Sequence, residues 1–304
     1  ETAIIGCGGR GGSNMANTAR TENVVALCDV NAHNLNRAAT KHPKARTYRD
    51  FRKLYEKTGD IDAVVGSTTE QTHAFAVLPA LQAKKHVFCE KPLTRDVYEA
   101  RVLTKAAKAA GVATQMGTQI HAGNNYRRVV EKIQSGAIGP VREAHVWVGR
   151  AWGWQSQEAA KRNRDIVWSF ETPKEAQTPP AHLDFDTWLG PAPRVPYQSN
   201  MLHGIWRWWH AFGTGDMGND GVHDLDIARW GLGVTTHPDR IVALGGKYFF
   251  DDDQQFPDTQ NVLFEYGPDA ATGKPRQLIF EQRIWAPYVE QGYENGDAFY
   301  GTDG

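Results

Sequence analysis

The sequence predicts an α/β protein of two domains, the first built on a doubly wound parallel sheet and the second on a largely antiparallel open sheet. The first 120 residues alternate short apolar strands with helical patterns, which is typical of a parallel sheet with helices on both faces. Beyond residue 120, one helix is followed by runs of strands. That order favours an α+β domain whose strands pair mostly antiparallel.

The elements of the first domain follow one another at short intervals. We expect strands at 3–6, 24–29, 63–66, 86–89 and 112–116, and helices at 11–20, 31–41, 50–57, 72–84 and 94–110. The last helix has the clearest signals, because Thr94 is placed to cap it and Gly111 to end it.

The elements of the second domain are more widely spaced. We expect a helix at 123–136, a strand at 141–148, a helix at 221–231, and strands at 240–249, 261–266 and 277–285. Residues 155–200 are rich in Pro, Gln and Asp, so we interpret them as an ordered surface excursion with a short amphipathic turn at 185–189. The predicted domains are residues 1–120 and 121–304.

The first predicted strand runs directly into a glycine-rich loop, Gly6-Cys7-Gly8-Gly9-Arg10-Gly11. In a G-x-G-x-x-G pattern, Gly6 permits the tight turn, Gly8 lets the backbone approach a pyrophosphate, and Gly11 lets the next helix pack closely on the strand. The N-terminus of that helix offers N–H groups and a positive dipole end to an anion. The loop therefore predicts a dinucleotide-binding Rossmann domain, with Arg10 along the pyrophosphate.

The second predicted strand ends at Asp29, where an acid can bind the 2′-OH of the adenosine ribose. A carboxylate there repels a 2′-phosphate, and no Arg immediately follows it. We therefore expect NAD as the cofactor, in preference to NADP. The alternative is a structural glycine turn followed by a surface Asp.

Composition and charge argue against several classes of partner. The formal net charge is −1 with both signs interspersed, which disfavours nucleic acid and anionic membrane surfaces. No apolar run approaches the roughly twenty residues that span a bilayer.

Cys7, Cys28 and Cys89 fall at the ends of predicted buried strands, and we interpret them as buried apolar residues. Ten tryptophans are many for 304 residues; most we expect in the core, but a cluster beside polar groups can form a platform for a sugar ring.

The two ends of the chain carry a separate expectation. The chain starts at Glu1 and stops on the turn-like Tyr300–Gly304. We expect residues to be missing at both ends, in which case an export signal would not be visible. The expected compartment is the bacterial cytoplasm, with the periplasm as the alternative.

Polar residues follow the strand predicted at 63–66. Ligands of open parallel sheets bind beyond the carboxyl ends of the strands, so Thr68 and His73 are expected to face the cofactor. The alternative is an ordinary helix N-cap at Thr69 or Thr72.

The tripeptide Glu90-Lys91-Pro92 follows the strand predicted at 86–89. Pro92 restricts Glu90 and Lys91 to extended backbone and is compatible with a cis peptide bond, which would set the direction of Lys91. A Lys in a half-buried cleft beside a cationic nicotinamide has its ammonium form disfavoured and can exchange protons near neutral pH. The alternative is a solvated Lys before a helix.

A glycine-rich segment at 213–221 leads into a predicted helix that carries His223. Asn219, His223 and Asp226 have spacings of four and three, which place them near one face and aim an amide and an imidazole into one pocket. Asp226 can alternatively pair with Arg229. His-x-x-Asp without a second His or Cys is poor ligand spacing, so we predict no metal site.

Four segments together, in this order, resemble the Gfo/Idh/MocA oxidoreductase family as far as about residue 235. The segments are Gly6–Gly11, Glu90–Pro92, Gly117–Gln119 and Gly218–Asp226. The resemblance implies a Rossmann domain, a C-terminal α/β domain with an open antiparallel sheet, and a pyranose or cyclitol substrate at the nicotinamide. It implies Lys91 and His223 as the catalytic pair, and places Glu90 and Gln119 at the cofactor.

The chain departs from the family pattern at one position. Many members have Asp four residues before the His, where this chain has Asn219. Since Asn cannot take a proton, we expect Asn219 to hydrogen-bond a substrate hydroxyl, with Asp220 or Asp216 supplying negative charge. Trp208 and His203 are further candidates for contact with the sugar.

The resulting hypothesis is an NAD-dependent oxidoreductase in which Lys91, helped by His223, takes the proton of a secondary hydroxyl of a sugar or cyclitol as hydride leaves the carbon. One alternative is glycoside cleavage through transient sugar oxidation and elimination. Another is a non-catalytic dinucleotide or sugar sensor, against which the intact Lys91 and His223 argue. Because an open sheet face needs covering, we also expect a homo-oligomer, either a dimer or a tetramer.

Overall fold

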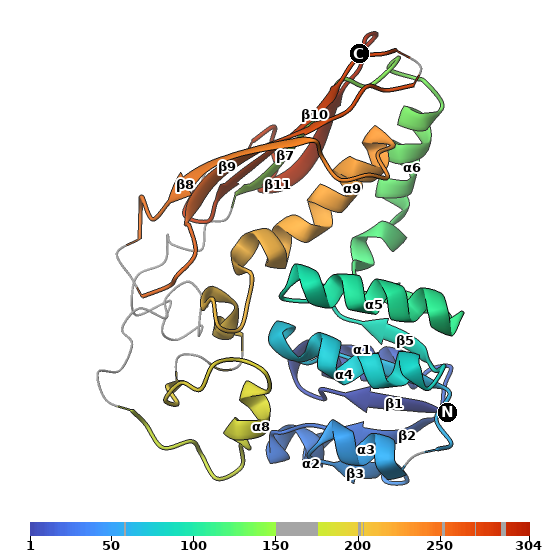
Figure 1. Cartoon of the computed structure of the whole chain (residues 1–304), viewed down its shortest axis with the longest axis vertical. Coiled ribbons are helices and arrows are strands. Elements are labelled where there is room, and N and C mark those ends of the chain that lie inside the picture. Colours follow the sequence, from blue (N-terminus) through green and yellow to red (C-terminus); the bar gives the residue numbers. More distant parts are fainter. Residues whose placement is uncertain are drawn as a thin grey trace. The chain divides into compact units, whose positions relative to one another are not determined.

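The computed structural model describes residues 1–57, 59–149, 176–199, 202, 204–250, 253–270, 272–286 and 290–304 (Figure 1). They fall into two compact units. Unit 1 comprises Glu1–Gly117 and the described part of Thr172–Thr214, and unit 2 comprises the described parts of Thr118–Glu171 and Gly215–Gly304. Among these residues, no helix combines the length and apolar character needed to cross a membrane.

Unit 1 is built on a six-stranded parallel sheet with the order β3-β2-β1-β4-β5-β6. The strands are β1 (Thr2–Ile5), β2 (Val24–Cys28), β3 (Arg46–Tyr48), β4 (Ala63–Gly66), β5 (His86–Cys89) and β6 (Thr114–Met116). The order runs outward in both directions from the β1–β4 pair, so the carboxyl ends of these two strands form the switch point where doubly wound sheets bind ligands. The predicted Rossmann architecture is confirmed.

Helices cover both faces of this sheet. They are α1 (Gly9–Thr18), α2 (Ala32–Lys41), α3 (Phe51–Lys57), α4 (Glu70–Gln82) and α5 (Val97–Ala110). Successive strand residues point to opposite faces, so Ile4 and Leu27 pack with residues of α1 and α2, whereas Ile5 and Ala26 pack with residues of α3 and α4. The cysteines at 7, 28 and 89 are buried thiols in these two cores, as predicted.

The start of α5 differs from the prediction. Asp96 is its N-cap and forms a capping box with Glu99, while Thr94 Oγ1 donates to the Asp96 carbonyl oxygen over 2.9 Å. A carboxylate followed by Glu three residues later satisfies two backbone N–H groups, which the hydroxyl at Thr94 could not do. Gly111 ends the helix in the left-handed conformation with φ 65°, as expected.

The described residues of 176–214 pack with unit 1, whereas the sequence-based boundary placed them in the second domain. They contain α8 (Phe185–Leu189), at the predicted amphipathic turn, and the 3-10 helix η5 (Ile205–Trp208). An isolated antiparallel bridge pairs Leu183 with Asn31, which follows β2. Such backbone pairing over a long sequence distance leaves no periodic pattern for sequence analysis to detect.

Unit 2 is built on a five-stranded sheet with the order β11-β7-β10-β9-β8. The strands are β7 (Glu143–Gly149), β8 (Arg240–Gly246), β9 (Thr259–Tyr266), β10 (Arg276–Arg283) and β11 (Asn295–Tyr300). Only β7 and β10 run parallel among these neighbours; the other pairs are antiparallel. The prediction of a largely antiparallel sheet is therefore confirmed, in the form of a mixed sheet.

The helices of unit 2 are the 3-10 helix η1 (Gln119–Ala122), α6 (Asn124–Gln134), the π-helical turn η6 (Met217–Gly221) and α9 (Val222–Leu232). In Figure 1, α9 lies along the sheet and α6 packs beside it. Ala228 and Leu232 of α9 join Val146, Val262 and Phe280 in the core of this unit, and Met217 of η6 packs against them.

Candidate functional site

A cavity of about 570 Å³ lies at the carboxyl edge of the parallel sheet in unit 1. Its walls come from the loops after β1, β2, β3 and β4 and from described residues of 183–188 and 204–207. The principal lining residues are Gly6, Gly8, Arg10, Asp29, Asn31, Asn34, Arg49, Thr68, Thr69, Thr72, Leu183, Thr187, Trp188, Gly204, Trp206 and Arg207. The cavity therefore occupies the switch point that the strand order defines.

The glycine loop has a geometry that only glycine permits. Gly6 has φ +89°, and a Cβ added to it would lie 2.4 Å from the Ser67 carbonyl oxygen. A Cβ on Gly11 would lie 2.0 Å from the Gly6 carbonyl oxygen, so the first turn of α1 is pressed against the loop. Gly8 is the N-cap residue of α1, whose first N–H groups are available to an anion. This cradle fits the pyrophosphate of a dinucleotide.

Asp29 is held in place by backbone hydrogen bonds at the end of β2. Its Oδ2 accepts from the Cys7 N–H and its Oδ1 accepts from the Asn31 N–H, both over 2.8 Å. The carboxylate thus joins the glycine loop to the start of α2 while lining the cavity. Its place fits the adenosine ribose of a dinucleotide.

Glu90 connects the glycine loop to the loop after β5. Its side chain is buried, and Oε1 accepts from Asn14 Nδ2 over 2.9 Å and from Arg10 Nε over 3.3 Å. Its Oε2 accepts from the Lys91 backbone N–H over 3.1 Å. Glu90 therefore orients Arg10 toward the cavity and holds the backbone at Lys91; direct contact with the cofactor stays a prediction.

Lys91 is half-buried after β5, and its peptide bond to Pro92 is cis. The neighbouring acid is Glu70, at the start of α4, which is 1% exposed and accepts a 2.7 Å hydrogen bond from Thr214 Oγ1. Burial raises the pKa of Glu70 to about 7, and the hydrogen bond from Thr214 and the charges of Arg207 and Lys91 offset part of this rise. Sequence analysis missed Glu70, because its partners Thr214 and Arg207 are far away along the chain.

The polar loop after β4 divides between the cavity and the core. Thr68, Thr69 and Thr72 line the cavity, and Thr69 is also the N-cap residue of α4. His73 instead is fully buried, with Nδ1 2.8 Å from the Pro92 carbonyl oxygen and Nε2 3.0 Å from the Thr68 carbonyl oxygen. Burial lowers the pKa of His73, and the hydrogen bonds to the Pro92 and Thr68 carbonyl oxygens offset part of this fall; the ring lies between the loop after β4 and the loop after β5. Its predicted contact with the cofactor stays a prediction.

In unit 2, the residues predicted around His223 lie on a π-helical turn and the helix that follows it. Asn219 is buried in η6, and its Nδ2 donates to Asp216 Oδ1 over 3.2 Å; Asp220 lies on the same turn. His223 and Asp224 are buried in the first turn of α9. Single π-helical turns recur at functional sites because they re-aim side chains within a helix.

Asp226 pairs with charged or polar neighbours on the helix surface, as in the alternative that paired it with Arg229. Its carboxylate lies 3.1 Å from His121 Nε2 and 3.9 Å from Arg229 Nη1. This pairing occupies Asp226 on the exposed side of α9, so it does not share the buried position of His223.

Two further predicted residues, Trp208 and Gln119, are not among the residues that line the cavity. Trp208 is fully buried in the core of unit 1, and its neighbours Trp206 and Arg207 line the cavity instead. Gln119 is exposed on η1 in unit 2. His203 lies outside the described residues. The roles of all three stay predictions.

The cavity wall contributed by described residues of 183–188 and 204–207 is the main part that was not predicted from the sequence. Leu183, Thr187, Trp188, Trp206 and Arg207 all come from it. The only signal in the sequence was the short amphipathic turn at 185–189, and that pattern does not indicate which edge of the sheet the segment contacts. Arg49 was missed for a different reason, since the strand before it has only three residues.

No metal site was predicted, and one group in unit 2 could form one. His145, Glu281 and Glu290 place one ligand atom each within 4.8 Å of one another. Glu281 Oε2 also lies 2.9 Å from Arg283 Nη1, so the Arg already supplies a positive charge. The prediction that the protein uses no metal remains a prediction.

Two family models match the chain. An oxidoreductase-family model described as an NAD-binding Rossmann fold matches residues 1–118, and the model of the C-terminal alpha/beta domain of the same family matches residues 129–261.

Individual relatives are more distant. Myo-inositol 2-dehydrogenase of Thermotoga maritima is 29% identical over 138 residues, which are 45% of this chain and 41% of that protein. The 1,5-anhydro-D-fructose reductase of Ensifer adhaerens is 41% identical over 90 residues, which are 29% of this chain and 26% of that protein. The chain thus spans less than half the length of these curated relatives.

Among solved structures, the fold is similar to that of the WlbA dehydrogenase of Bordetella pertussis, crystallised with NADH and UDP-GlcNAcA. The TM-score is 0.67 at 17% identity, over 99% of this chain and 75% of that one. At this identity the likeness concerns the fold.

Proposed function

Because the chain belongs to the Gfo/Idh/MocA family of oxidoreductases, we propose that it oxidises a secondary hydroxyl of a sugar or cyclitol with NAD. The observation that carries the proposal is the cavity at the switch point of unit 1, where the glycine cradle and Asp29 fit a dinucleotide and Lys91 follows the neighbouring strand β5. The names of the relatives, an inositol dehydrogenase and an anhydrofructose reductase, support the substrate class.

In this proposal the residues of the chain orient the substrate and move a proton. Bound NAD supplies the hydride acceptor. Lys91 Nζ accepts the hydroxyl proton, since a Lys close to the positive nicotinamide exchanges protons near neutral pH. His223 is the second acid–base group, and Asn219 and Asp220 bind substrate hydroxyls. Support for Lys91 comes from its backbone hydrogen bond to buried Glu90, which limits its freedom.

The test is the substitution Lys91→Ala, with Lys85→Ala as the matched control because Lys85 is a lysine of the same intermediate burial just before the same strand. Loss of an acid–base group lowers kcat by about 10²–10⁴-fold, so Lys91→Ala is expected to lose activity in this range with NAD affinity retained. Formation of reduced cofactor is followed with myo-inositol, 1,5-anhydro sugars and a panel of pyranoses.

Three outcomes bear on the proposal. Sustained NADH formation by the wild type, lost in Lys91→Ala, supports the proposal. Cleavage of a glycoside without accumulation of NADH would replace it with oxidation and elimination. Activity of Lys91→Ala within about threefold of wild type would contradict the role of Lys91, given the expected 10²-fold minimum.

We also propose that the protein forms a homo-oligomer through the open face of the five-stranded sheet. Val242 on β8 and Leu263 on β9 are paired in register, and Leu244 is two residues further on the same strand face. Val242 and Leu244 are 66% and 73% exposed. An apolar sheet face that faces water is a typical site of association, and a second copy offers a matching apolar face.

A further inference from the structure

The segment 182–190, here called the strap, connects two parts of the cavity edge. At one end it is paired with the loop after β2: the Ala32 N–H donates to the His182 carbonyl oxygen over 2.8 Å, and the Asp184 N–H donates to the Val30 carbonyl oxygen over 3.0 Å. Arg49 Nη2 donates to both of these carbonyl oxygens, over 3.2 and 2.8 Å. The strap is thus attached on the side of the cavity where Asp29 lies.

At its other end the strap is attached to α4. Buried Gln71 donates through Nε2 to the Trp188 carbonyl oxygen over 3.2 Å. Gly190 packs so closely that an added Cβ would lie 2.8 Å from Thr72 Cγ2. The strap therefore runs from the loop after β2 to the first turn of α4, and between these attachments Leu183, Thr187 and Trp188 line the cavity.

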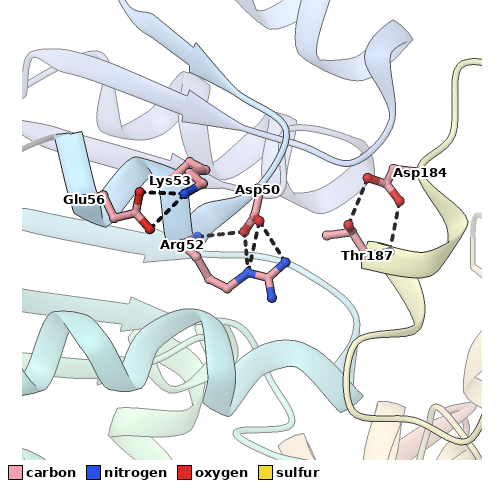
Figure 2. Close-up of polar contacts among 6 residues, drawn as sticks. All are labelled: Asp50, Arg52, Lys53, Glu56, Asp184 and Thr187. Atoms are coloured by element: carbon pink, nitrogen blue, oxygen red, sulfur yellow. Dashed lines mark hydrogen bonds and ion pairs between the residues drawn. The ribbon is translucent and has the colours of Figure 1, made fainter.

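Packing and capping hold the strap in shape. Trp188 is almost fully buried, and its ring meets Phe212 edge-on with centroids 4.9 Å apart. Asp184 caps α8: Oδ1 accepts from the Thr187 N–H over 3.0 Å and Oδ2 accepts from Thr187 Oγ1 over 2.9 Å (Figure 2). Figure 2 also shows Arg52, whose guanidinium contacts the Asp50 carboxylate. The hydrogen bond with Asp50 raises the pKa of Arg52, and the charge of nearby Asp184 raises it further.

We propose that the strap is a second wall of the dinucleotide site, which closes over bound NAD and must open before NAD enters or leaves. An open switch-point crevice lets a dinucleotide approach from outside the strand ends without backbone movement. Here the same crevice is lined by a segment that backbone hydrogen bonds attach at one end and a hydrogen bond from the Gln71 side chain attaches at the other. The inference rests on the proposed function only for the identity of the cofactor, and its test needs no sugar.

The test compares Asp184→Ala with the matched control Asp186→Ala. Asp184 does not itself line the cavity, and its loss removes both hydrogen bonds to Thr187. Asp186 lies on the same short helix but pairs with exposed Arg194. Loss of a helix N-cap shifts a local equilibrium by about fivefold, so the open form of the strap becomes about fivefold more populated in Asp184→Ala.

The readout is NAD exchange, without turnover. Protein loaded with NADH is mixed with excess NAD, and energy transfer from the protein tryptophans to NADH reports release; the reverse mixing reports binding. If the strap gates the site, Asp184→Ala speeds release and binding alike by about fivefold and leaves Kd nearly unchanged. Asp186→Ala is expected to match the wild type.

Two results would overturn the proposal. One is equal exchange rates in Asp184→Ala and the wild type. The other is faster release with unchanged binding, because this indicates a lost contact with the cofactor and no gate. Should Asp184→Ala fail to fold, hydrogen exchange of the wild type decides: saturating NAD must slow exchange of the Ala32 and Asp184 amides, and unchanged rates would refute closure over the cofactor. Slow NAD exchange without any sugar oxidation would leave the strap intact and reject only the proposed activity.

Discussion

Glu70 is a buried acid whose titration makes the stability of the folded protein depend on pH. Its pKa, raised to about 7 from an ordinary 4.5, means that the folded protein holds a proton that the unfolded chain releases. Between these two pH values the folded state binds more protons, so the free energy of unfolding falls as pH rises. Above pH 7 the folded protein carries a buried carboxylate. The free-energy cost of burying this charge is only partly offset by the hydrogen bond from Thr214 and the charges of Arg207 and Lys91.

We therefore expect Glu70→Gln to match the wild type near pH 5 and to be more stable by about 2 kcal/mol near pH 8, since the neutral amide keeps an acceptor for Thr214 and has no charge to bury. Urea unfolding at both pH values measures this difference. Glu56→Gln on exposed α3 is the control and should show no such pH dependence. A parallel pH dependence in Glu70→Gln and the wild type would contradict the assignment.

Individual site residues differed in how well they could be predicted. The glycines and Asp29 could be predicted because their chemistry depends on neighbours in the chain or at a fixed spacing, and the cavity contains Gly6, Gly8 and Asp29. Glu70 could not, because its hydrogen bond with Thr214 spans 144 residues. Trp208 was predicted to contact the sugar because it belongs to a tryptophan cluster. The composition shows the cluster, but only packing decides that Trp208 is buried and that Trp206 lines the cavity.

At the scale of elements, strand β11 and helix α9 meet through two acids. Asn295 Nδ2 on β11 donates to Asp224 Oδ2 on α9 over 3.2 Å, and Asp297 lies two residues further along β11. Burial, together with the charge of Asp224, raises the pKa of Asp297 to about 9. At neutral pH the folded protein therefore keeps Asp297 protonated beside ionisable Asp224, and this strand–helix contact weakens as pH rises toward 9.

Asp297→Asn should remove the loss of stability that the wild type shows as pH rises toward 9. A neutral amide mimics the protonated acid, so we expect the variant to resemble the wild type at pH 6 and to exceed its stability by at least about 1 kcal/mol at pH 9. Thermal unfolding across this range provides the measurement, with exposed Asp303→Asn as the control. The interpretation fails if Asp297→Asn loses stability with pH as steeply as the wild type does.

The elements themselves were predictable where the pattern was local and strong. The apolar strands and the amphipathic helices of unit 1 follow from their period, since each buries a regular set of side chains. Strands β3 and β11 were not predicted: β3 has only three residues, and β11 begins Asn-Gly-Asp, residue types depleted in strands. Backbone pairing with β2 and β7 makes them strands in spite of this composition.

At the scale of the whole molecule, the open face of the second sheet is the feature with the clearest consequence. Leu244→Asp places a charge among exposed apolar residues of that face, and desolvating it would oppose association. We expect the wild type to be a dimer or tetramer and Leu244→Asp to shift to a smaller species, measured by gel filtration with light scattering. Val97→Asp, an equally exposed position on α5, should leave the mass unchanged. A monomeric wild type, or an unchanged mass in Leu244→Asp, would reject the proposed interface.

The sequence by itself determined the family, the Rossmann architecture, the mostly antiparallel second sheet and the cofactor. These properties reside in short motifs and in periods of two and 3.6 residues, which backbone geometry translates directly into local structure. Only the tertiary structure decided that residues of the strap line the cavity at the edge of the parallel sheet, that Glu70 is a buried acid with a pKa of about 7, and that α9 begins from a π-helical turn. Burial and the pairing of distant segments create those properties, and neither leaves a periodic signal along the chain.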